Sequence, residues 1–339
     1  MTELQRQVRA IRERAAVSRP SPAVVRVTGE GAWAFLDRVL PCELHLREAQ
    51  LRATLLLRAD GSVLADVLVG AEDADFWLFV EGLDEPALLA HLGSFCEDGE
   101  DVQLAGLAAT HAAIAVDGPY AWEALEAVGE RGIGGMPYLS LARLDGDVRC
   151  VRAGRTGEYG YTLLVPHDAV DATLSQLGDV VRVDPAALTH CALENWFFDI
   201  HAPFAARFTP LELQLQARLS RRKGDVLGMP ALAARREAGG LRRTVGLRGP
   251  LGLAAGDALR LDGDVVGEVL QTAPWFGASG GSIGMGLLPL RLAHPGLDVL
   301  SVPSGPVMTV SAPLLLNRSL LVRPSRRPPD PASLPDPYA

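Results

Sequence analysis

The sequence has 339 residues, of which 48 % are hydrophobic and 22 % charged, a composition typical of folded globular proteins that excludes wholesale disorder. A net charge of −9 argues against a general nucleic-acid scaffold, because phosphate binding depends on clustered lysine and arginine. At roughly 100–200 residues per domain, this length predicts two or three domains.

Four scattered cysteines, Cys42, Cys96, Cys150 and Cys191, form no C-x-x-C pair. This spacing predicts neither a zinc site nor a disulfide framework, so we expect no metal and a cytoplasmic protein. The amino terminus lacks the continuous apolar run of a secretory signal. We also expect no membrane association, since no stretch reaches the roughly 18–20 apolar residues of a membrane span.

In chain order, the hydrophobic pattern predicts a short charged helix over 4–16 and then a strand, a glycine turn and an amphipathic helix over 23–40. A hairpin over 52–70 follows, with Ala-Asp-Gly-Ser at its turn. A third strand over 75–82 and a helix over 84–95 complete this group of elements.

The same plan then recurs, with a strand, a Gly-Pro turn and a helix over 111–128, a hairpin over 147–166 and a helix over 168–178. The fold class we predict is therefore α+β, with two related α/β halves. Their predicted bounds are 1–105 and 106–240, the second half including a basic, helix-rich segment over 205–237. Short β runs with glycine turns predict a small β-barrel over 241–322, and a proline-rich composition predicts an extended tail over 323–339.

The stretch "VRAGRTGEYGYTLLVP", residues 151–166, places three glycines directly before an apolar strand. Tight turns need such glycines, and that interpretation accounts for Gly154, Gly157 and Gly160. It leaves three charged residues of the same stretch, Arg152, Arg155 and Glu158, unexplained.

The order of segments resembles that of the glycine cleavage T-protein (aminomethyltransferase) family and its folate-binding relatives, which include YgfZ-type proteins linked to iron–sulfur enzyme maintenance. Five motifs carry the resemblance, in the family's order, between about residues 10 and 320. They are "GEGAWAFL" (29–36), "GSVLADVLV" (61–69), "VRAGRTGEYGYT" (151–162), "TPLELQLQARLSRRKGDVLGMPAL" (209–232) and "VVGEVLQTAPWFGASGGSIGMGLL" (265–288).

The resemblance implies two α/β halves around a central folate pocket, followed by the barrel. It further implies a tetrahydrofolate cofactor and the transfer of a one-carbon unit from a small amine or methyl donor, free or carried on a lipoyl protein. The catalytic candidate is Asp66, the second residue of the family's D-D pair; Ala65 replaces the first. A strand carboxylate can hold an amine or take a proton from it when the two lie within hydrogen-bond reach, although it can also be simply solvated.

Folate combines a carboxylate tail with a stackable ring, so its pocket should pair cations with aromatic walls. Surface charge and core packing are the competing interpretations for each candidate. The candidate cofactor-binding residues are Arg152, Arg155, Glu158, Tyr161, Thr162, Glu194, Trp196, Arg207 and Lys223.

Several positions depart from the family's pattern. Thr162 stands where a glutamate is expected to grip the pterin ring, and Glu194 lacks the arginine expected near it. Glu158 and Glu194 are the carboxylates that we consider as substitutes. Asp225 occupies the cysteine position of the YgfZ-type signature. Three interpretations therefore stand together: a transferase, a non-catalytic folate-binding accessory protein, and a ligand-free interaction module.

Overall fold

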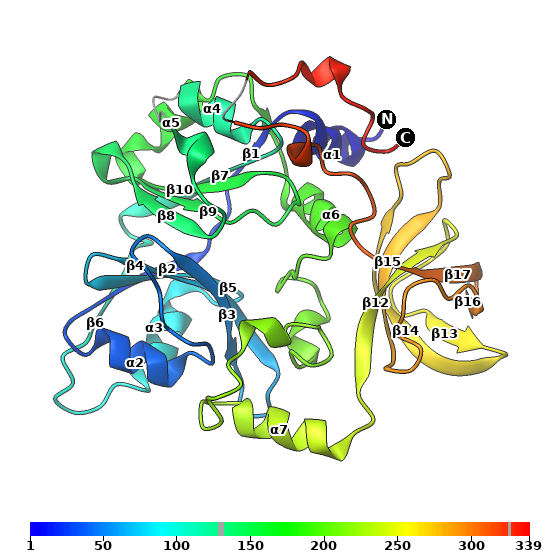
Figure 1. Cartoon of the computed structure of the whole chain (residues 1–339), viewed down its shortest axis with the longest axis horizontal. Helices are drawn as coiled ribbons and strands as arrows, with labels where there is room; N and C mark the ends of the chain where they lie inside the picture. Colours follow the sequence, from blue (N-terminus) through cyan, green and yellow to red (C-terminus); the bar gives the residue numbers. More distant parts are fainter. Residues whose placement is uncertain (128–131, 325–326) are drawn as a thin grey trace.

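The computed structural model describes residues 1–127, 132–324 and 327–339, and it consists of two stacked β-sheets with their helices, a connecting segment and a β-barrel at the opposite end (Figure 1). The arrangement confirms the α+β class with a closed carboxy-terminal barrel that the sequence predicted.

The first sheet has the strand order β3-β4-β5-β2-β6, and helices α2 and α3 cover its outer face. Side chains along β4 point alternately to the two faces of the sheet. Those of Val63, Ala65, Val67 and Val69 are buried, and they alternate with half-buried residues, including Asp66. Asp66 therefore points to the inner face, toward the second sheet. The elements are β2 (Ala23–Thr28), α2 (Ala32–Val39), β3 (Leu51–Leu57), β4 (Val63–Glu72), β5 (Asp75–Glu81), α3 (Glu85–Gly93) and β6 (Gln103–Gly106).

The second sheet has the order β11-β1-β7-β10-β9-β8, with the apolar sides of α4 and α5 packed on its outer face. Helix α6 follows the last strand of this sheet and leads toward the barrel (Figure 1). The elements are β7 (His111–Asp117), α4 (Ala121–Ala127), β8 (Ser140–Arg143), β9 (Arg149–Arg152), β10 (Gly160–Pro166), α5 (Val170–Gln176), β11 (Val181–Arg182) and α6 (Pro185–Asn195).

The amino-terminal residues lie with the second sheet, although their sequence position groups them with the predicted first half, 1–105. Strand β1 (Ala16–Ser18) pairs in parallel with β11 and antiparallel with β7. Helix α1 (Glu3–Glu13) packs on α6. These pairings join residues far apart in the sequence, which a local hydrophobic pattern does not encode.

The inner faces of the two sheets pack against each other through an apolar layer that draws on both. Val24, Leu51 and Phe79 come from the first sheet, and Leu141 and Leu164 from the second. This layer fixes the spacing between the sheets and so shapes the cavity beside it.

The segment that connects the second sheet to the barrel contains less helix than its composition predicts. Between residues 205 and 238 it forms two short 3-10 helices, η4 (Ala205–Arg207) and η5 (Gln216–Arg218), and one α-helix, α7 (Met229–Ala238). The remainder is turns, because the segment buries Phe204, Phe208 and other apolar side chains against β3 and the barrel.

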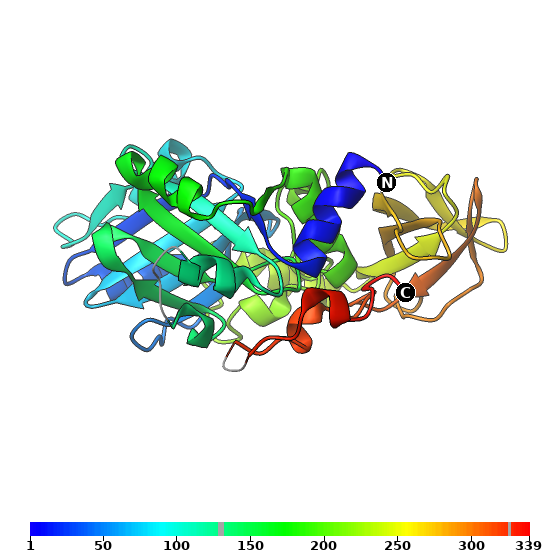
Figure 2. The same cartoon turned by 90° about the horizontal axis from the view of Figure 1, so that it is seen from above.

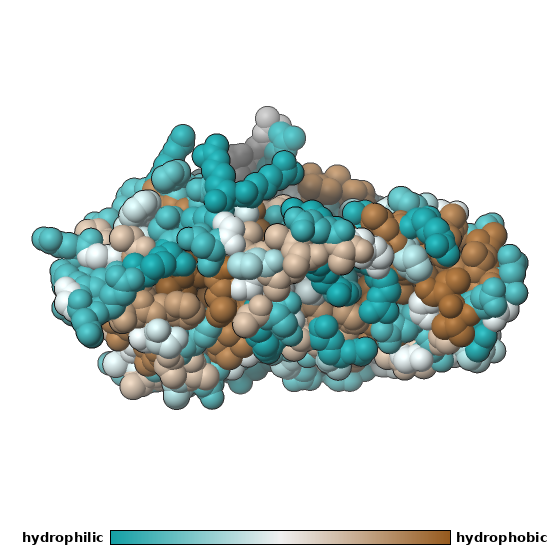
Figure 3. Space-filling view, turned by 90° about the horizontal axis from the view of Figure 1, so that it is seen from below, coloured by the Kyte–Doolittle hydropathy of each residue, from teal (hydrophilic) through white to brown (hydrophobic). Residues whose placement is uncertain are grey.

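The barrel closes in the order β12-β15-β14-β13-β16-β17 around its own apolar core. On the face shown in Figure 3, hydrophilic residues are interspersed with hydrophobic ones. The exposed large hydrophobic residues of the barrel include Leu251, Val265 and Val299. Its strands are β12 (Arg242–Gly249), β13 (Ala258–Leu261), β14 (Asp264–Pro274), β15 (Ser282–Pro289), β16 (Leu300–Val302) and β17 (Gly305–Val310).

The carboxy-terminal tail returns to the region of the amino-terminal helix, and both lie between the sheets and the barrel in Figure 2. Arg9 of α1 forms an ion pair with Asp336, and the Tyr338 side chain is buried. The tail has a single 3-10 turn, η7 (Pro331–Ser333), in its described part. Residues 327–339 are thus docked on the second half and its helices.

Candidate functional site

The central cavity lies between the inner faces of the two sheets. It consists of two adjoining pockets of about 140 and 360 Å³ that share Pro20, Pro22, Glu81, Arg155 and Thr162 among their lining residues. The larger pocket falls within the range of about 300–1,000 Å³ that is common for small-molecule sites.

Asp66 lines the smaller pocket, and its carboxylate Oδ1 accepts a hydrogen bond of 2.5 Å from Nη1 of Arg218. The Asp66 side chain is 13 % exposed. Burial raises the pKa of Asp66, and the nearby Glu81 adds to this, while the positive charges of Arg218 and Arg155 oppose it; the net pKa lies above the usual value. The carboxylate is thereby a better proton acceptor than a solvated aspartate.

Glu81, at the end of β5, links the two halves of the chain across the cavity. Its Oε2 lies 2.7 Å from Nη1 of Arg155 and 3.3 Å from Nε2 of His201. Burial raises the pKa of Glu81, but the hydrogen bond from His201 and the charge of Arg155 outweigh it and hold the pKa below its usual value. The same hydrogen bond raises the pKa of His201.

The glycine-rich loop 153–159 brings the second half to the cavity, with Arg155 pointing to Glu81. A Cβ placed on Gly160 would lie 2.7 Å from Oδ1 of Asp117, and one on Gly154 would lie 3.1 Å from the same atom. The backbones of the two glycines come closer still, because a Cβ on Gly160 would lie 2.3 Å from Cα of Gly154. Both glycines are therefore required, since this part of the loop passes close to itself and to the buried Asp117 carboxylate at the end of β7.

Asp117 lines the larger pocket and is 6 % exposed. Burial raises its pKa to about 6, against the opposing effects of a hydrogen bond from Thr156 and the charges of Arg155 and Arg12. A carboxylate with such a pKa changes charge close to neutral pH.

Tyr161 and Thr162, on β10, both line the larger pocket. The Tyr161 ring also packs in the core of the second half, and burial raises its pKa to about 12. Arg152 lies over the rings of Tyr159 and Tyr161, with its guanidinium carbon 5.0 and 5.5 Å from the two ring centroids. Arg152 thus braces the aromatic core behind the cavity.

Glu158 and Glu194 lie together in a separate buried cluster centred on Arg12 of α1. Nη2 of Arg12 is 2.6 Å from Oε2 of Glu194, and Nη1 is 3.6 Å from Oε1 of Glu158; all three side chains are fully buried. Glu158 accepts hydrogen bonds from the backbone N–H groups of Arg318 and Ser319. Glu194 accepts further bonds from His190 and the Tyr338 hydroxyl.

Helix α6 has no arginine near Glu194. Arg12 of α1 supplies the missing guanidinium and donates a hydrogen bond to Glu194. Burial raises the pKa of Glu158. Burial also acts to raise the pKa of Glu194, but His190 and Arg12 more than offset this and lower it. The cluster joins α1, the glycine-rich loop, α6 and the tail.

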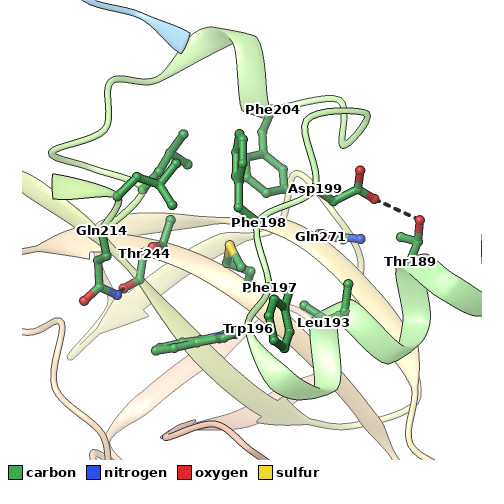
Figure 4. Close-up of a pocket in the computed structure, with 14 residues that line it drawn as sticks. Thr189, Leu193, Trp196, Phe197, Phe198, Asp199, Phe204, Gln214, Thr244 and Gln271 are labelled. Atoms are coloured by element: carbon green, nitrogen blue, oxygen red, sulfur yellow. Dashed lines mark hydrogen bonds between the residues drawn. The ribbon is translucent and has the colours of Figure 1, made fainter. Parts of the chain in front are cut away.

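Trp196 lies at the end of α6 in another pocket, of about 210 Å³, whose lining includes aromatic, aliphatic and polar side chains (Figure 4). Phe197 and Phe198 line this pocket with it, and Asp199 accepts a hydrogen bond from Thr189 at its edge. The Trp196 ring also packs against the core of the barrel. Phe197 reaches the smaller pocket of the central cavity, so the two sites adjoin.

Arg207 and Lys223 lie outside the residues that form the cavity wall in the described part of the chain. Arg207 is on the surface, 3.5 Å from Glu268. Lys223 Nζ donates to Oδ1 of Asp37 and to the backbone carbonyls of Asp37 and Leu40, where it caps the end of α2. The structure thus gathers Asp66, Arg155, Tyr161 and Thr162 of the predicted residues at the cavity.

The sequence analysis missed five acidic or arginine residues of the cavity: Arg19, Glu81, Asp117, Asp199 and Arg218. Glu81 and Asp117 each stand at the end of an otherwise apolar strand, and this is the local signal that could have marked them. Arg218 lies among other arginines in a basic segment, so no local pattern distinguishes it.

Among residues 1–127, 132–324 and 327–339, no group of three or more His, Cys, Asp and Glu side chains could hold a metal ion. Within the same ranges, none of the helices has the length and apolar character needed to cross a bilayer.

Comparison with known proteins identifies relatives over most of the chain. An aminomethyltransferase of Mycobacterium leprae is 30 % identical over 243 residues, which are 68 % of this chain and 65 % of the relative, so the match spans just under two thirds of that protein. A probable aminomethyltransferase of Natronomonas pharaonis is 29 % identical over 297 residues, covering 83 % of this chain and 81 % of the relative.

The crystal structure of the glycine cleavage system aminomethyltransferase T from Bartonella henselae has the same fold, with a TM-score of 0.82 at 24 % identity over 93 % of this chain and 90 % of the other. The family model described as the GCVT N-terminal domain matches residues 1–223. Because residues 1–223 are more than half of this chain, the chain belongs to the glycine cleavage T-protein (aminomethyltransferase) family.

Proposed function

We propose that the central cavity binds a tetrahydrofolate-type cofactor and that the protein transfers a one-carbon unit to it from an amine or methyl donor. The observation that carries the proposal is Asp66: a carboxylate with a raised pKa, placed on the inner face of β4 in a cavity between two related halves. Membership of the aminomethyltransferase family supports the same function.

The residues around the cavity fit such a cofactor. Leu68, Phe79 and Leu139 provide apolar walls for a ring system, while Arg155 and Arg218 provide cations for its carboxylate tail. The Ser18 hydroxyl lines the larger pocket and is buried without a hydrogen-bond partner among the described residues, so it is available to a ligand. When bound, tetrahydrofolate would supply the amine nitrogens that accept the one-carbon unit.

The chain's own part in the reaction rests on how Asp66 is held. Arg218 binds Oδ1 and fixes the orientation of the carboxylate, which leaves Oδ2 for an amine within the cavity. Because burial raises the pKa of Asp66, the carboxylate can take a proton from that amine more readily than a solvated aspartate can. The surrounding apolar walls limit access of water to the same oxygen.

A turnover assay tests the proposal. Purified protein is incubated with tetrahydrofolate and, in separate reactions, a free methylated amine or a lipoyl-bound aminomethyl donor. Methyl transfer from the first donor yields 5-methyl-tetrahydrofolate and the demethylated amine, whereas the second yields methylene-tetrahydrofolate, ammonia and the free lipoyl thiol; these folate products are measured. We expect Asp66→Asn to lower turnover by about 10²–10⁴-fold, the typical contribution of a positioned acid–base group. The matched control is Asp73→Asn, at the exposed tip of the next hairpin. Equal turnover by the parent protein and Asp66→Asn would contradict the role of Asp66.

A second candidate, folate binding without turnover, is favoured by one observation. The guanidinium of Arg218 pairs directly with Asp66, and this ion pair opposes the rise in pKa that burial produces and occupies one of the two carboxylate oxygens. Such an accessory role predicts that the protein binds 5-formyl-tetrahydrofolate but shows no transfer with either type of donor. Transfer abolished by Asp66→Asn would exclude it.

A further inference from the structure

Four carboxylates line the central cavity, and they differ in the partners that their oxygens have. Asp66 is paired with Arg218, and Glu81 with Arg155 and His201. Asp199 uses both oxygens, since Oδ2 accepts from Thr189 and Oδ1 from the backbone N–H of His201.

Asp117 differs from the other three carboxylates. Its one hydrogen bond from the described residues goes to Oδ1, from the Thr156 hydroxyl, and no cationic side chain of those residues lies within 4 Å of it. Oδ2 of this buried side chain therefore has no partner in the described part of the chain. Because Asp117 lines the larger pocket, this oxygen is open to a hydrogen-bond donor from a ligand.

The strand register places Asp117 beside two hydroxyls on one face of the second sheet. Ser18 and Thr162 both lie opposite Ala115 of β7, one on each side, and Asp117 is two residues further along the same strand. Because side chains alternate along a strand, these three residues share the face that forms the larger pocket. The small Ala115 leaves open space between them.

We infer that Asp117 is the carboxylate that binds the pterin ring, accepting hydrogen bonds from its aminopyrimidine edge, with Ser18 and Thr162 as the neighbouring polar groups. The inference rests on the proposed folate function and adds to it the residue that determines ring specificity. A 2-amino-4-oxopyrimidine presents two adjacent N–H donors, and a carboxylate meets such a pair with two charge-assisted bonds.

The pattern also explains why Thr162 is tolerated on β10. A hydroxyl cannot make two charge-assisted bonds, whereas the carboxylate of Asp117, on the adjacent strand and the same face, can. Glu158 and Glu194 are unable to take this role, because both are held in the fully buried Arg12 cluster.

The test measures binding of 5-formyl-tetrahydrofolate and of its 2-desamino analogue by calorimetry, with the intact protein and Asp117→Asn. The asparagine keeps the acceptor for Thr156 but replaces Oδ2 with an N–H group that opposes the ligand's donors. We expect the intact protein to bind the analogue about 10- to 100-fold more weakly, and Asp117→Asn to bind both ligands with similar, reduced affinity. Adding Thr162→Glu to Asp117→Asn should restore the preference for the 2-amino compound.

Other outcomes separate this inference from the proposed function. If the intact protein binds 5-formyl-tetrahydrofolate and Asp117→Asn binds it equally well with the same preference over the analogue, the inference is wrong and the proposed function stands. If the intact protein does not bind the compound, both fail. Asp199→Asn, which changes another carboxylate of the same cavity, is expected to retain the preference, and Asp117→Ser repeats the test should the asparagine variant not fold.

Discussion

Arg155 and Glu158 stand three residues apart in one glycine-rich loop, yet they belong to two different electrostatic regions of the molecule. Arg155 faces the central cavity, where side chains with incomplete hydrogen bonding meet open space. Glu158 faces the Arg12 cluster, where each of the three charged side chains is fully buried and bonded to several partners.

A structural carboxylate has both oxygens occupied by protein donors, whereas a carboxylate that can bind a ligand keeps one oxygen open. Glu158 and Glu194 look as suitable as Asp117 in the sequence, but the backbone N–H groups and side chains around them already occupy their oxygens. Asp117 retains an oxygen that no described residue satisfies. We therefore expect changes in the Arg12 cluster to affect stability and changes in the cavity to affect ligand affinity.

The largest effect should follow from Arg12→Met. The change leaves Glu158 and Glu194 buried without their cation, which typically costs about 3–5 kcal/mol in the free energy of unfolding. Chemical denaturation measures this value. A variant as stable as the parent protein would show that the cluster does not hold α1, α6 and the tail together.

Tyr338→Phe should give a smaller loss of stability. It removes the 2.7 Å hydrogen bond from the hydroxyl to Oε1 of Glu194, a bond to a charged group worth about 1.5–3 kcal/mol. The ring and its contacts with Trp275 and Phe276 are retained. Unfolding measurements on Tyr338→Phe, with affinity for 5-formyl-tetrahydrofolate as the second readout, should show lower stability and unchanged affinity; a selective loss of affinity would break the comparison.

The pH dependence of binding should identify the cavity. Asp117 must be charged to accept two hydrogen bonds, and its pKa of about 6 predicts that affinity falls about tenfold between pH 7 and pH 5. Arg12, Arg155 and the buried thiol of Cys191 face the same carboxylate, and none of these three changes charge in this range. Asp117→Asn should remove the fall in affinity between pH 7 and pH 5. An identical affinity profile in the variant would contradict the role of Asp117 as the ring-binding carboxylate.

The same raised pKa has a consequence for stability with the opposite sign. Below pH 6 the folded protein binds a proton at Asp117 that an unfolded aspartate still releases, so the contribution of Asp117 to stability increases as the pH falls from about 7 toward 4. Asp117→Asn should flatten this component of the stability profile in thermal melts. The variant should therefore lose stability more steeply in acid than the parent protein, and an equal or shallower loss would contradict the assigned shift.

The smallest effect on binding should come from Lys223→Met. Nζ of Lys223 is engaged by Asp37 and Leu40 at the end of α2, so we expect a loss of about 1 kcal/mol in stability. Calorimetry should find ligand affinity within about twofold of the parent protein, because salt screens a cation that lies outside the cavity and leaves it little influence on the ligand. A tenfold loss of affinity would instead place Lys223 near the ligand.

Local pattern was enough to predict most elements of the fold. The alternation of β4, the hairpin turn before it and the buried face of α2 follow directly from residues such as Val63, Val67 and Phe35. The local hydrophobic pattern was not enough to place β1, because its partner strands β7 and β11 are remote in the sequence.

The site was predicted less completely because its charges meet across the two halves. Asp66 and the glycine-rich loop were recognisable from their motifs, but the pairing of Asp66 with Arg218 joins residues 152 positions apart. Arg12 reaches Glu194 over 182 positions, so the sequence alone presented Glu194 as a free carboxylate. Such contacts depend on the packing of whole elements and leave no local signature.

We propose that the cavity between the two sheets is a folate site. Titration calorimetry of the intact protein with 5-formyl-tetrahydrofolate tests this proposal. We predict saturable one-to-one binding with a dissociation constant on the order of micromolar, which corresponds to a favourable binding free energy of about 8 kcal/mol. The absence of saturable binding under the same conditions would contradict the claim.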